Sequence, residues 1–513
     1  MAKIIDLNRV HADYSKTKIQ HLDALYCGGD KWRAFLGDWL PQAPAESKES
    51  YSQRKSRALY RNDFASIIDL VAAMLFSEEP SVKGLNERNA RIFATNADRD
   101  GSPGRVVLQT AFIDAMRYGV SWSWIRLPAS SGATSLKDQE ANGDLEWWLE
   151  HVDPINVLDW HEADQRIQWV KVADTLLDTS DPLKTPTVVY RWRIIDDKQI
   201  RTFTWTPRDE NQAKVAAGGE FPANATATES PPIKHGYGTL PLRRFRLRKG
   251  MALGPRMYDP AIAAIRAEHD ADDALFKAAH ALLVIGSDDH TNKPPILGQG
   301  HFLKTGKDDR VYFAEPSGNN TKLLVDRSGN ARSALYSAAQ QFQSGGHASS
   351  SPGAMYQSGA SKQMDWYAAE AQNASYADQI LAFVTDLMSA VAKVTNDPGE
   401  IEVTGLEGWH QMDIAGLLQA STLAFDAKVM SPTFQRALAT NIARRLLSNT
   451  ESPETMDAIY KEIADYEIGP LGLPGQFASG QDAAAQHGMT GASGAPKYPK
   501  GPSDADKDGQ LGE

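Results

Sequence analysis

Apolar residues recur along this chain with two different spacings, and each spacing occupies its own region. Residues 51–76 show the three-and-four spacing of an amphipathic helix, whereas residues 120–207 alternate apolar and polar positions as half-buried strands do. The sequence therefore predicts an α+β fold. The apolar positions of the helical stretch are Leu59, Phe64, Ile67, Ile68, Val71, Met74 and Leu75.

The first half of the chain predicts helices at 12–40, 51–76 and 106–118, followed by strands. We expect the strands at residues 120–128, 145–152, 168–176, 187–196, 199–207 and 240–248. A short turn at 196–198 joins two of them. In one strand Val188, Tyr190, Trp192 and Ile194 alternate with Val189, Arg191 and Arg193, which predicts a sheet with one solvated face. Residues 207–239, rich in Gly, Pro and Ala, are predicted as a polar loop.

Long helices are predicted in the second half. Asp259 and Pro260 are typical of a helix start, and the helix is expected to run to Ile285, about 39 Å. The block 286–327 is punctuated by Gly and Pro and carries strand-like pieces at 300–305, 309–315 and 322–326. Further helices are expected at 331–342, 362–394, 413–428, 432–448 and 453–465, the long one with an apolar stripe of Trp366, Tyr367, Ile380, Phe383, Val384, Leu387 and Val391. Residues 469–513 are predicted to be disordered.

The composition limits the class of protein. The net charge is −11, which argues against a protein that coats nucleic acid but not against one that lets nucleic acid slide past. A single cysteine, Cys27, rules out an internal disulfide and zinc sites built from several cysteines, and it fits a reducing cytoplasm. No run approaches the length of a membrane span and the start lacks a signal-peptide apolar region, so no membrane partner is expected.

Sequence motifs for catalysis and cofactor binding were sought and not found. The stretch GHFLKTGKDD has the wrong glycine spacing for a phosphate-binding loop, and neither G-x-S-x-G nor H-E-x-x-H occurs. The C-terminal Asp504, Asp506, Asp508 and Gly509 begin like a calcium loop, but the closing Glu at position 12 is missing. No catalytic residue, metal or cofactor is therefore predicted, and the protein is expected not to be an enzyme.

Two charged clusters remain as candidate contact sites. One runs along the predicted strand 240–248 and consists of Arg243, Arg244, Arg246, Arg248 and Lys249. These residues would touch phosphate or pair with acidic residues of an adjoining subunit. The other lies in the middle of the predicted 260–285 helix and consists of Glu268, Asp270, Asp272 and Asp273, flanked by Arg266 and Lys277. A solvated helix face is the ordinary interpretation of such a carboxylate cluster.

The stretch GGHASSSPGAMYQSGAS, residues 345–361, carries no charged side chain and lies between two predicted helices. Loops of more than about 12–15 residues are uncommon in compact domains and are usually functional or disordered. Small residues allow it to change conformation at low steric cost, and without cations it has no attraction for phosphate. An ordinary disordered surface loop is the alternative.

The order of these parts resembles the portal proteins of tailed bacteriophages, which form the ring at the capsid vertex through which DNA enters and leaves. The segment 51–80 resembles the family's N-terminal helix pattern, with Tyr51, Arg57, Asn62, Phe76 and Pro80. VLQTAFIDAMRYGVSWSWIRLP resembles its helix–Gly–strand segment around Gly119, and VDPINVLDWH its strand with Asp-Pro and Asp-Trp pairs. GTLPLRRFRLRKG, followed by a long helix and ALLVIG, resembles the crossing from wing to stem. The resemblance covers residues 50–400.

The resemblance implies the following organisation, with the names that the family uses. Residues 1–255 would form the wing, 256–285 a stem helix, 286–328 the clip, 329–344 a second stem helix and 345–361 the tunnel loop. Residues 362–412 would form a long wing helix and its connection, 413–468 the upper wing and crown helices, and 469–513 a disordered tail. The stem carboxylates would face either the channel or a neighbouring subunit, with Arg266 and Lys277 pairing between subunits, and alanines of the stem would let neighbouring helices approach closely.

The resemblance also implies function, partners and location. The protein would form a dodecameric ring in the virion, assembled in the bacterial cytoplasm, and would conduct double-stranded DNA non-specifically during packaging and ejection. Partners would be the terminase large subunit, head–tail adaptor proteins, and the major capsid and scaffolding proteins. The tunnel-loop residues that would border the DNA are His347, Ser349, Ser350, Met355, Tyr356 and Gln357.

Two alternatives stay open. The protein would be another phage head or adaptor protein, or a Mg²⁺-dependent nucleic-acid enzyme that uses the stem carboxylates. The spacing of Glu268, Asp270, Asp272 and Asp273 disfavours the enzyme, because residues two apart on a helix do not converge.

Overall fold

The computed structural model describes residues 2–406 and, further on, several residues between 433 and 443 and residues 453–465. Within 2–406 the description omits residues 45, 129–131, 133–134, 165, 180–185, 218, 223, 280–281, 287–309, 315–317, 340–358, 396 and 398. The chain divides into two compact units, Met1–Gln411 and Met412–Glu513. The first unit is a mixture of helices and antiparallel sheets, which confirms the predicted α+β class.

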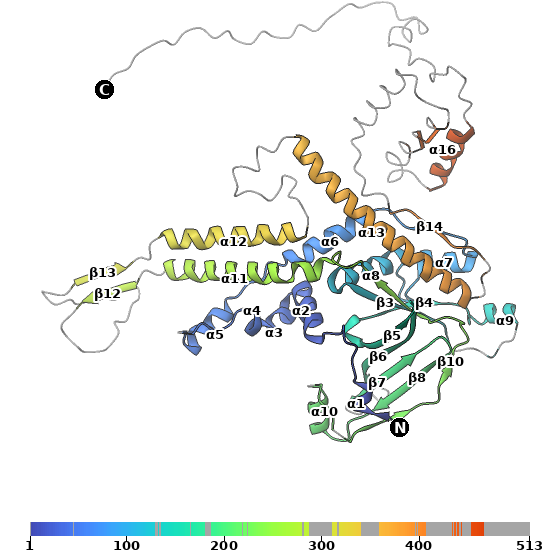
Figure 1. Cartoon of the computed structure of the whole chain (residues 1–513), viewed down its shortest axis with the longest axis horizontal. Helices are drawn as coiled ribbons and strands as arrows, with labels where there is room; N and C mark the ends of the chain where they lie inside the picture. The colour runs from blue at the N-terminus through green and yellow to red at the C-terminus, as the bar shows by residue number, and fades with distance from the viewer. Residues whose placement is uncertain are drawn as a thin grey trace, which may run out of the picture. The chain divides into compact units, whose positions relative to one another are not determined.

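Short helices form most of the N-terminal part of the first unit (Figure 1). The predicted helix 12–40 is broken into three pieces, and the predicted helix 51–76 is broken at residues 57–62. Side chains of Ser15, Ser47, Asn62 and Asn86 accept a backbone N–H at four helix starts, which explains where these helices begin. The helices are α1 (Ile4–Leu7), α2 (Lys16–Cys27), α3 (Gly29–Ala34), α4 (Leu36–Trp39), α5 (Lys48–Ser56), α6 (Asp63–Leu75), α7 (Glu87–Thr95) and α8 (Gly104–Tyr118).

The apolar stripe predicted for residues 59–75 is confirmed for α6 and wrong for Leu59. Phe64, Ile67, Ile68 and Leu75 are buried in α6. Leu59 precedes the Asn62 cap, lies outside the helix and is 73% exposed. The capping asparagine, not the apolar spacing, therefore decides where this helix begins.

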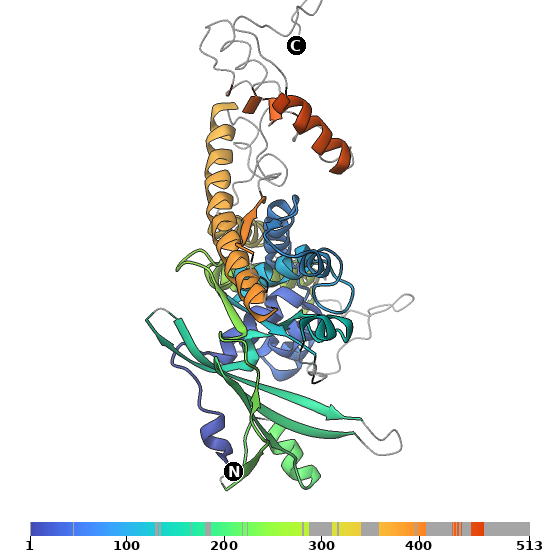
Figure 2. The ribbon, with the colours of Figure 1, turned by 90° about the vertical axis from the view of Figure 1, so that its right-hand side faces the viewer.

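The larger sheet has seven strands in the order β1-β9-β8-β7-β6-β5, with β10 also paired to β8, and neighbouring strands are antiparallel. It lies below α6 and α8 in both views (Figures 1 and 2). The predicted turn at 196–198 joins β7 to β8. The strands are β1 (Ala2–Lys3), β5 (Val157–Ala163), β6 (Arg166–Asp178), β7 (Thr187–Ile195), β8 (Gln199–Trp205), β9 (Thr226–Glu229) and β10 (Ile233–Lys234), and a 3-10 turn, Pro154–Asn156, precedes β5.

The prediction of one solvated face for this sheet is wrong. Trp192 packs with Ile4 and Leu7 of α1 on one face. On the other face Ile195 packs with Trp122 and Trp124 of a second sheet. Both faces are covered because the N-terminal segment and the second sheet lie on opposite sides of β7.

The second sheet has three strands in the order β11-β3-β4, namely β3 (Val120–Arg126), β4 (Trp148–Val152) and β11 (Leu242–Arg246). Gly119 lies between α8 and β3 with φ 87°, a left-handed conformation that favours glycine, and this lets the chain pass directly from helix to strand. A two-stranded antiparallel pair is formed by β2 (Ser81–Lys83) and β14 (Glu402–Thr404), which lies near the C-terminal end of the unit.

The prediction that residues 207–239 form a polar loop is wrong in part. It contains a helix, α10 (Glu210–Ala217), and the strands β9 and β10 that complete the larger sheet. Another short helix, α9 (Leu136–Ala141), precedes β4. Strands β9 and β10 were missed because their sequences are polar and they are stabilised by tertiary pairing with β1 and β8.

The predicted long helix is α11, and its bounds differ from the prediction. It runs from Leu253 to Ala279, so Pro260 lies inside the helix and Asp259 is not its cap. Residues 282–286, predicted as the helix end, form strand β12 (Leu282–Gly286), which pairs with β13 (Arg310–Ala314). The predicted strand 322–326 is wrong, because helix α12 runs from Gly318 to Ala338 and includes it.

The long helix predicted at 362–394 is confirmed as α13 (Gly359–Val394). Ile380, Val384, Leu387 and Val391 are buried against α6, α8 and α11 in the main core of the unit. Trp366 and Tyr367 fall on residues whose side chains lie outside the description.

The second unit contains α16 (Pro453–Asp465), which agrees with the predicted helix 453–465. Six residues between 433 and 443 are also helical, within the predicted helix 432–448. The helix predicted at 413–428 and the predicted disordered tail 469–513 lie outside the described residues.

Candidate functional site

The helices α11 and α12 form a long antiparallel pair that extends from the helical body (Figure 1). With 27 residues, α11 is about 40 Å long. Strands β12 and β13 pair with each other between the end of α11 and the start of α12, from Leu282 opposite Ala314 to Gly286 opposite Arg310. The helical pair therefore carries a two-stranded β-ribbon at its far end and contacts the helical body at its near end.

Most of the stem carboxylates predicted from the sequence face arginines of the same chain. Asp273 accepts a hydrogen bond from Arg57 at 2.9 Å, and Glu268 lies 3.3 Å from Arg61. Both arginines come from the segment that joins α5 to α6. The carboxylates of α11 therefore attach this segment to the helical pair.

The remaining residues of this cluster differ in their surroundings. Asp270 lies 4.0 Å from Arg327 of α12, at the outer limit of an ion pair. Asp272 is exposed. Arg266, predicted to pair between subunits, donates to the backbone oxygens of Trp39 and Asp38 at the end of α4. The side chain of Lys277 lies outside the description.

Burial shifts the pKa of two groups on α11. Burial raises the pKa of the Glu268 carboxyl, and the charge of Arg61 opposes the shift only in part. Burial likewise lowers the pKa of His269, and the charge of Arg54 lowers it further. Both shifts favour the neutral form of the side chain.

The basic run also finds partners within the chain. Arg243 lies 3.4 Å from Asp386 of α13. Burial lowers the pKa of Arg243. Arg244 donates to Glu162 of β5 at 2.9 Å. Arg246, Arg248 and Lys249 are exposed. Arg243 and Arg244 thus each have an acidic partner in the same chain.

The tunnel-loop residues predicted from the sequence fall between α12 and α13 in the chain. His347, Ser349, Ser350, Met355, Tyr356 and Gln357 all lie outside the described residues. The helices on either side are described: α12 ends at Ala338 and α13 begins at Gly359.

A buried cluster of charges around Arg117 was missed by the sequence analysis. Arg117 of α8 donates to Asp114 at 2.9 Å and to Asp23 of α2 at 2.5 Å. His151 of β4 lies 2.6 Å from the second oxygen of Asp114. The signal was present in the sequence, because Asp114 and Arg117 lie three residues apart on the buried face of α8, where the other buried residues are apolar or glycine.

A second missed cluster joins the two sheets. The guanidinium groups of Arg126 and Arg193 each lie 4.4 Å from the ring centre of Trp124. Arg193 also donates to Asp174 of β6 at 2.7 Å. Burial lowers the pKa of Arg193 to about 10. This arrangement fixes β3 against β6 and β7, which gives it a structural role.

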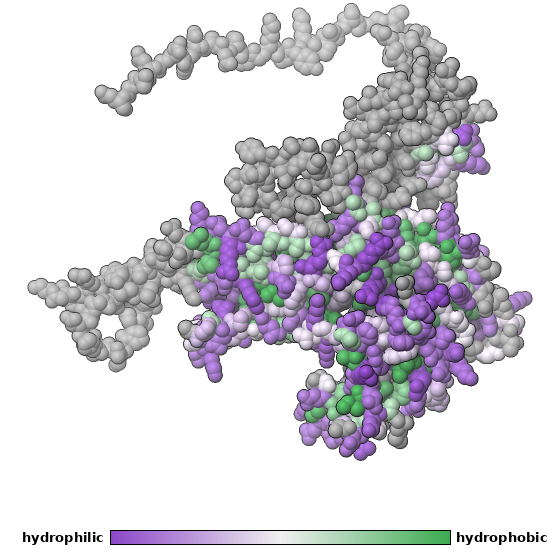
Figure 3. Space-filling view, viewed as in Figure 1, coloured by the Kyte–Doolittle hydropathy of each residue, from purple (hydrophilic) through white to green (hydrophobic). Residues whose placement is uncertain are grey.

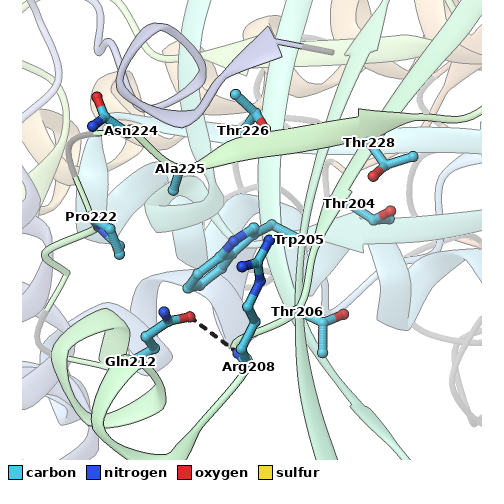
Figure 4. Close-up of a pocket in the computed structure, with 10 residues that line it drawn as sticks. All are labelled: Thr204, Trp205, Thr206, Arg208, Gln212, Pro222, Asn224, Ala225, Thr226 and Thr228. Carbon is cyan, nitrogen blue, oxygen red and sulfur yellow. Dashed lines mark hydrogen bonds between the residues drawn. The ribbon is translucent and has the colours of Figure 1, made fainter.

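A polar pocket lies where β8 and β9 separate, beside α10 (Figure 4). It has a volume of about 490 Å³. Among the described side chains, those that line the pocket include no Asp, Glu, His, Cys or Lys. The residues that line it are Thr204, Trp205, Thr206, Arg208, Gln212, Pro222, Asn224, Ala225, Thr226 and Thr228.

Neither a group of potential metal ligands nor a membrane-spanning helix occurs among the residues that the structure describes. In that part of the chain no three or more His, Cys, Asp or Glu residues are grouped so that they could hold a metal ion. Among the same residues no helix is both long and apolar enough to cross a membrane.

Comparison with known proteins adds no relative. No protein-family model matches the sequence, and no curated protein matches it.

Proposed function

We propose that this chain is a subunit of a phage portal: a structural ring protein that conducts double-stranded DNA and carries no active site. Within that proposal α11 and α12 are the stem helices, and β12 and β13 belong to the clip. The ring would have twelve copies and would lie at the capsid vertex of the virion.

One observation carries the proposal: the antiparallel helical pair with a β-ribbon at its far end. This pair is inserted between a sheet-containing body, which precedes it in the chain, and the 36-residue helix α13, which follows it. Most of the core of the first unit lies in that body and not in the pair. A long projection from a compact body suits a conduit wall better than a binding pocket.

The charges of the helical pair are consistent with this role. A bare row of carboxylates on α11 would repel DNA strongly, but Arg57 and Arg61 offset two of them within the chain. The proposed clip would dock the ATP-driven terminase and later the head–tail adaptor proteins. The major capsid and scaffolding proteins would contact the body.

The experiment that tests the proposal is imaging of the purified full-length protein by negative stain. We expect conical rings with a central hole and a mass of about 670 kDa for twelve copies of 56.2 kDa. We also expect no ATP hydrolysis by the protein alone. A monomer at micromolar concentration, or measurable nuclease activity that Mg²⁺ supports, would contradict the proposal.

A further inference from the structure

The polar pocket beside α10 lies where two neighbouring strands of the larger sheet diverge. The pairing of β8 with β9 covers Phe203 and Thr204, which lie opposite Glu229 and Thr228. Beyond these residues β8 stays paired with β7 and β9 stays paired with β1, so the two strands move apart. The cavity of about 490 Å³ opens in this gap, and its volume lies within the range of small-molecule sites, about 300–1,000 Å³.

Arg208 brings a positive charge to this pocket. Its backbone N–H donates to the side-chain oxygen of Gln212 at 3.1 Å, whereas its guanidinium has no hydrogen-bond or ion-pair partner among the described residues. The two acidic residues that directly adjoin lining residues in the sequence are engaged elsewhere. Asp209 caps α10 by accepting the N–H of Gln212 at 2.8 Å, and Glu229 accepts from Arg201 at 2.9 Å. The described lining therefore favours an anionic ligand.

Neutral hydrogen-bonding groups line the pocket together with this guanidinium. Thr204 and Thr228 lie opposite each other on β8 and β9, so their hydroxyls are on the same face of the sheet. Because the side-chain oxygen of Gln212 accepts the Arg208 N–H, the NH2 group of the same amide is left as a donor. The exposed Asn224 offers a second amide. Guanidinium, hydroxyl and amide donors are the groups that proteins commonly use to bind phosphate oxygens.

Trp205 gives the pocket an aromatic wall. It points to the opposite side of β8 from Thr204, and both line the cavity because the gap between the strands reaches both sides (Figure 4). The ring centre of Trp205 lies 5.6 Å from that of Tyr190 and 5.5 Å from that of Phe221, and these contacts hold the indole in place. Trp205 remains partly exposed. Figure 3 shows the same mixture of hydrophilic and hydrophobic residues at the surface around α10.

We propose that this pocket binds a small organic anion that consists of a flat ring and a phosphate group, of the size of a mononucleotide. Arg208 and the hydroxyls of Thr204 and Thr228 bind the phosphate. The ring packs against Trp205, since indole side chains stack well with nucleobases. The two amides of the lining bind the polar edge of the ring, as Asn and Gln side chains do with adenine.

A phosphate group fits this lining better than a carboxylate does. A phosphate monoester presents three terminal oxygens, whereas a carboxylate presents two. The guanidinium of Arg208 and the two threonine hydroxyls together supply enough donors for three oxygens. The inference does not rest on the proposed function, because the pocket lies within one chain and involves neither a neighbouring copy nor DNA.

The test is isothermal titration calorimetry of the full-length protein with adenosine monophosphate, and with adenosine and inorganic phosphate as the two halves of that probe. We expect saturable binding of adenosine monophosphate at one site per chain. Adenosine and inorganic phosphate should each bind at least tenfold more weakly, because each keeps only part of the contacts. No saturable binding of adenosine monophosphate at millimolar concentration, or adenosine that binds equally tightly, would overturn the inference.

Substitutions assign the binding to this pocket. We expect Arg208→Gln to weaken the binding of adenosine monophosphate at least tenfold, and Arg208→Lys, which keeps the charge, to weaken it less. The matched control is Arg246→Gln, which removes another exposed arginine, on β11, and should leave the affinity unchanged. Circular dichroism checks that all three variants fold. If Arg208→Gln binds the nucleotide as the unaltered protein does, the site is elsewhere and the inference is wrong.

Discussion

Arg332 donates two hydrogen bonds to the two carboxylate oxygens of Asp63, at 2.7 and 2.8 Å, and so joins α12 to the first residue of α6. The geometry is that of a bidentate pair, which is stronger and more directional than a single contact. Asp63 also lies in the first turn of α6, where a negative charge is favourable. The contact anchors the near end of the helical pair to the body.

This pair should show a measurable coupling energy. We expect a double-mutant cycle with Arg332→Lys and Asp63→Asn to give about 1 kcal/mol in urea unfolding, because Arg332 is partly exposed and solvent screens the pair. The matched control is Arg327→Lys with Asp270→Asn, whose 4.0 Å contact should give a coupling near zero. Equal coupling in both cycles would contradict the assignment of Asp63 as the anchor.

The Asp23 carboxylate should make stability depend on pH. Burial alone would raise the pKa of Asp23, but the hydrogen bond from Lys31 and the charge of Arg117 hold it below its usual range. The folded state then binds a proton less readily than the unfolded state. The stabilisation is therefore present above the unfolded pKa of about 4 and is lost as the pH falls through the lower folded value.

We expect Asp23→Asn to lower the free energy of unfolding by about 1.5–3 kcal/mol at pH 7, and by less below pH 4, in denaturant titrations at both pH values. Asp13→Asn, at a side chain 72% exposed, is the control and should show no such change. A loss that is the same at both pH values would contradict the role of the Asp23 charge.

Gly254 allows α11 to approach α8 closely. A Cβ at this position would lie 2.0 Å from the backbone oxygen of Arg117, so the two helices would have to separate. We expect Gly254→Ala to destabilise the protein by about 1–3 kcal/mol or more in thermal unfolding. Gly37→Ala, where the Cβ would meet nothing within 4 Å, should have little effect. If Gly254→Ala leaves the unfolding temperature unchanged, α8 and α11 can separate here at little cost in free energy and the prediction is wrong.

Asn89 links three parts of the core through its amide. It accepts a hydrogen bond from the Trp147 indole at 3.0 Å and donates to Thr395 at 2.8 Å. Asn89→Ala leaves the buried indole N–H without its acceptor, so we expect a loss of about 1–3 kcal/mol, measured by urea unfolding. Asn211→Ala, at an exposed position of α10, should stay within about 0.5 kcal/mol. If the two variants lose equal stability, the hydrogen bonds of Asn89 contribute little.

The elements that the sequence predicted well are those whose pattern is local. Helices α8, α13 and α16 and strands β7 and β8 have clear apolar periods and appear close to where they were expected. The start of α11 was misplaced because Pro260 suggested a first turn, although the body supports a helix that begins at Leu253. Strands β9 and β10 have no apolar pattern and depend on their neighbours, so the sequence could not reveal them.

In the candidate site, too, local features could be predicted from the sequence and contacts between distant segments could not. The sequence identified the carboxylates of α11 and the basic run, because charge clusters are visible in one dimension. It could not identify Arg57, Arg61 or Glu162 as their partners, since these lie 82 or more residues away along the chain. Ion pairs between distant segments depend on the fold.

The exposed thiol of Cys27, the one cysteine of the sequence, donates a hydrogen bond to the carboxylate of Asp23. Burial and the Asp23 carboxylate raise the pKa of this thiol, so it will react slowly with maleimides near neutral pH and faster in mild alkali. Each subunit therefore accepts one fluorophore at one defined position. Counting photobleaching steps on such labelled particles would report directly how many copies a single assembly contains.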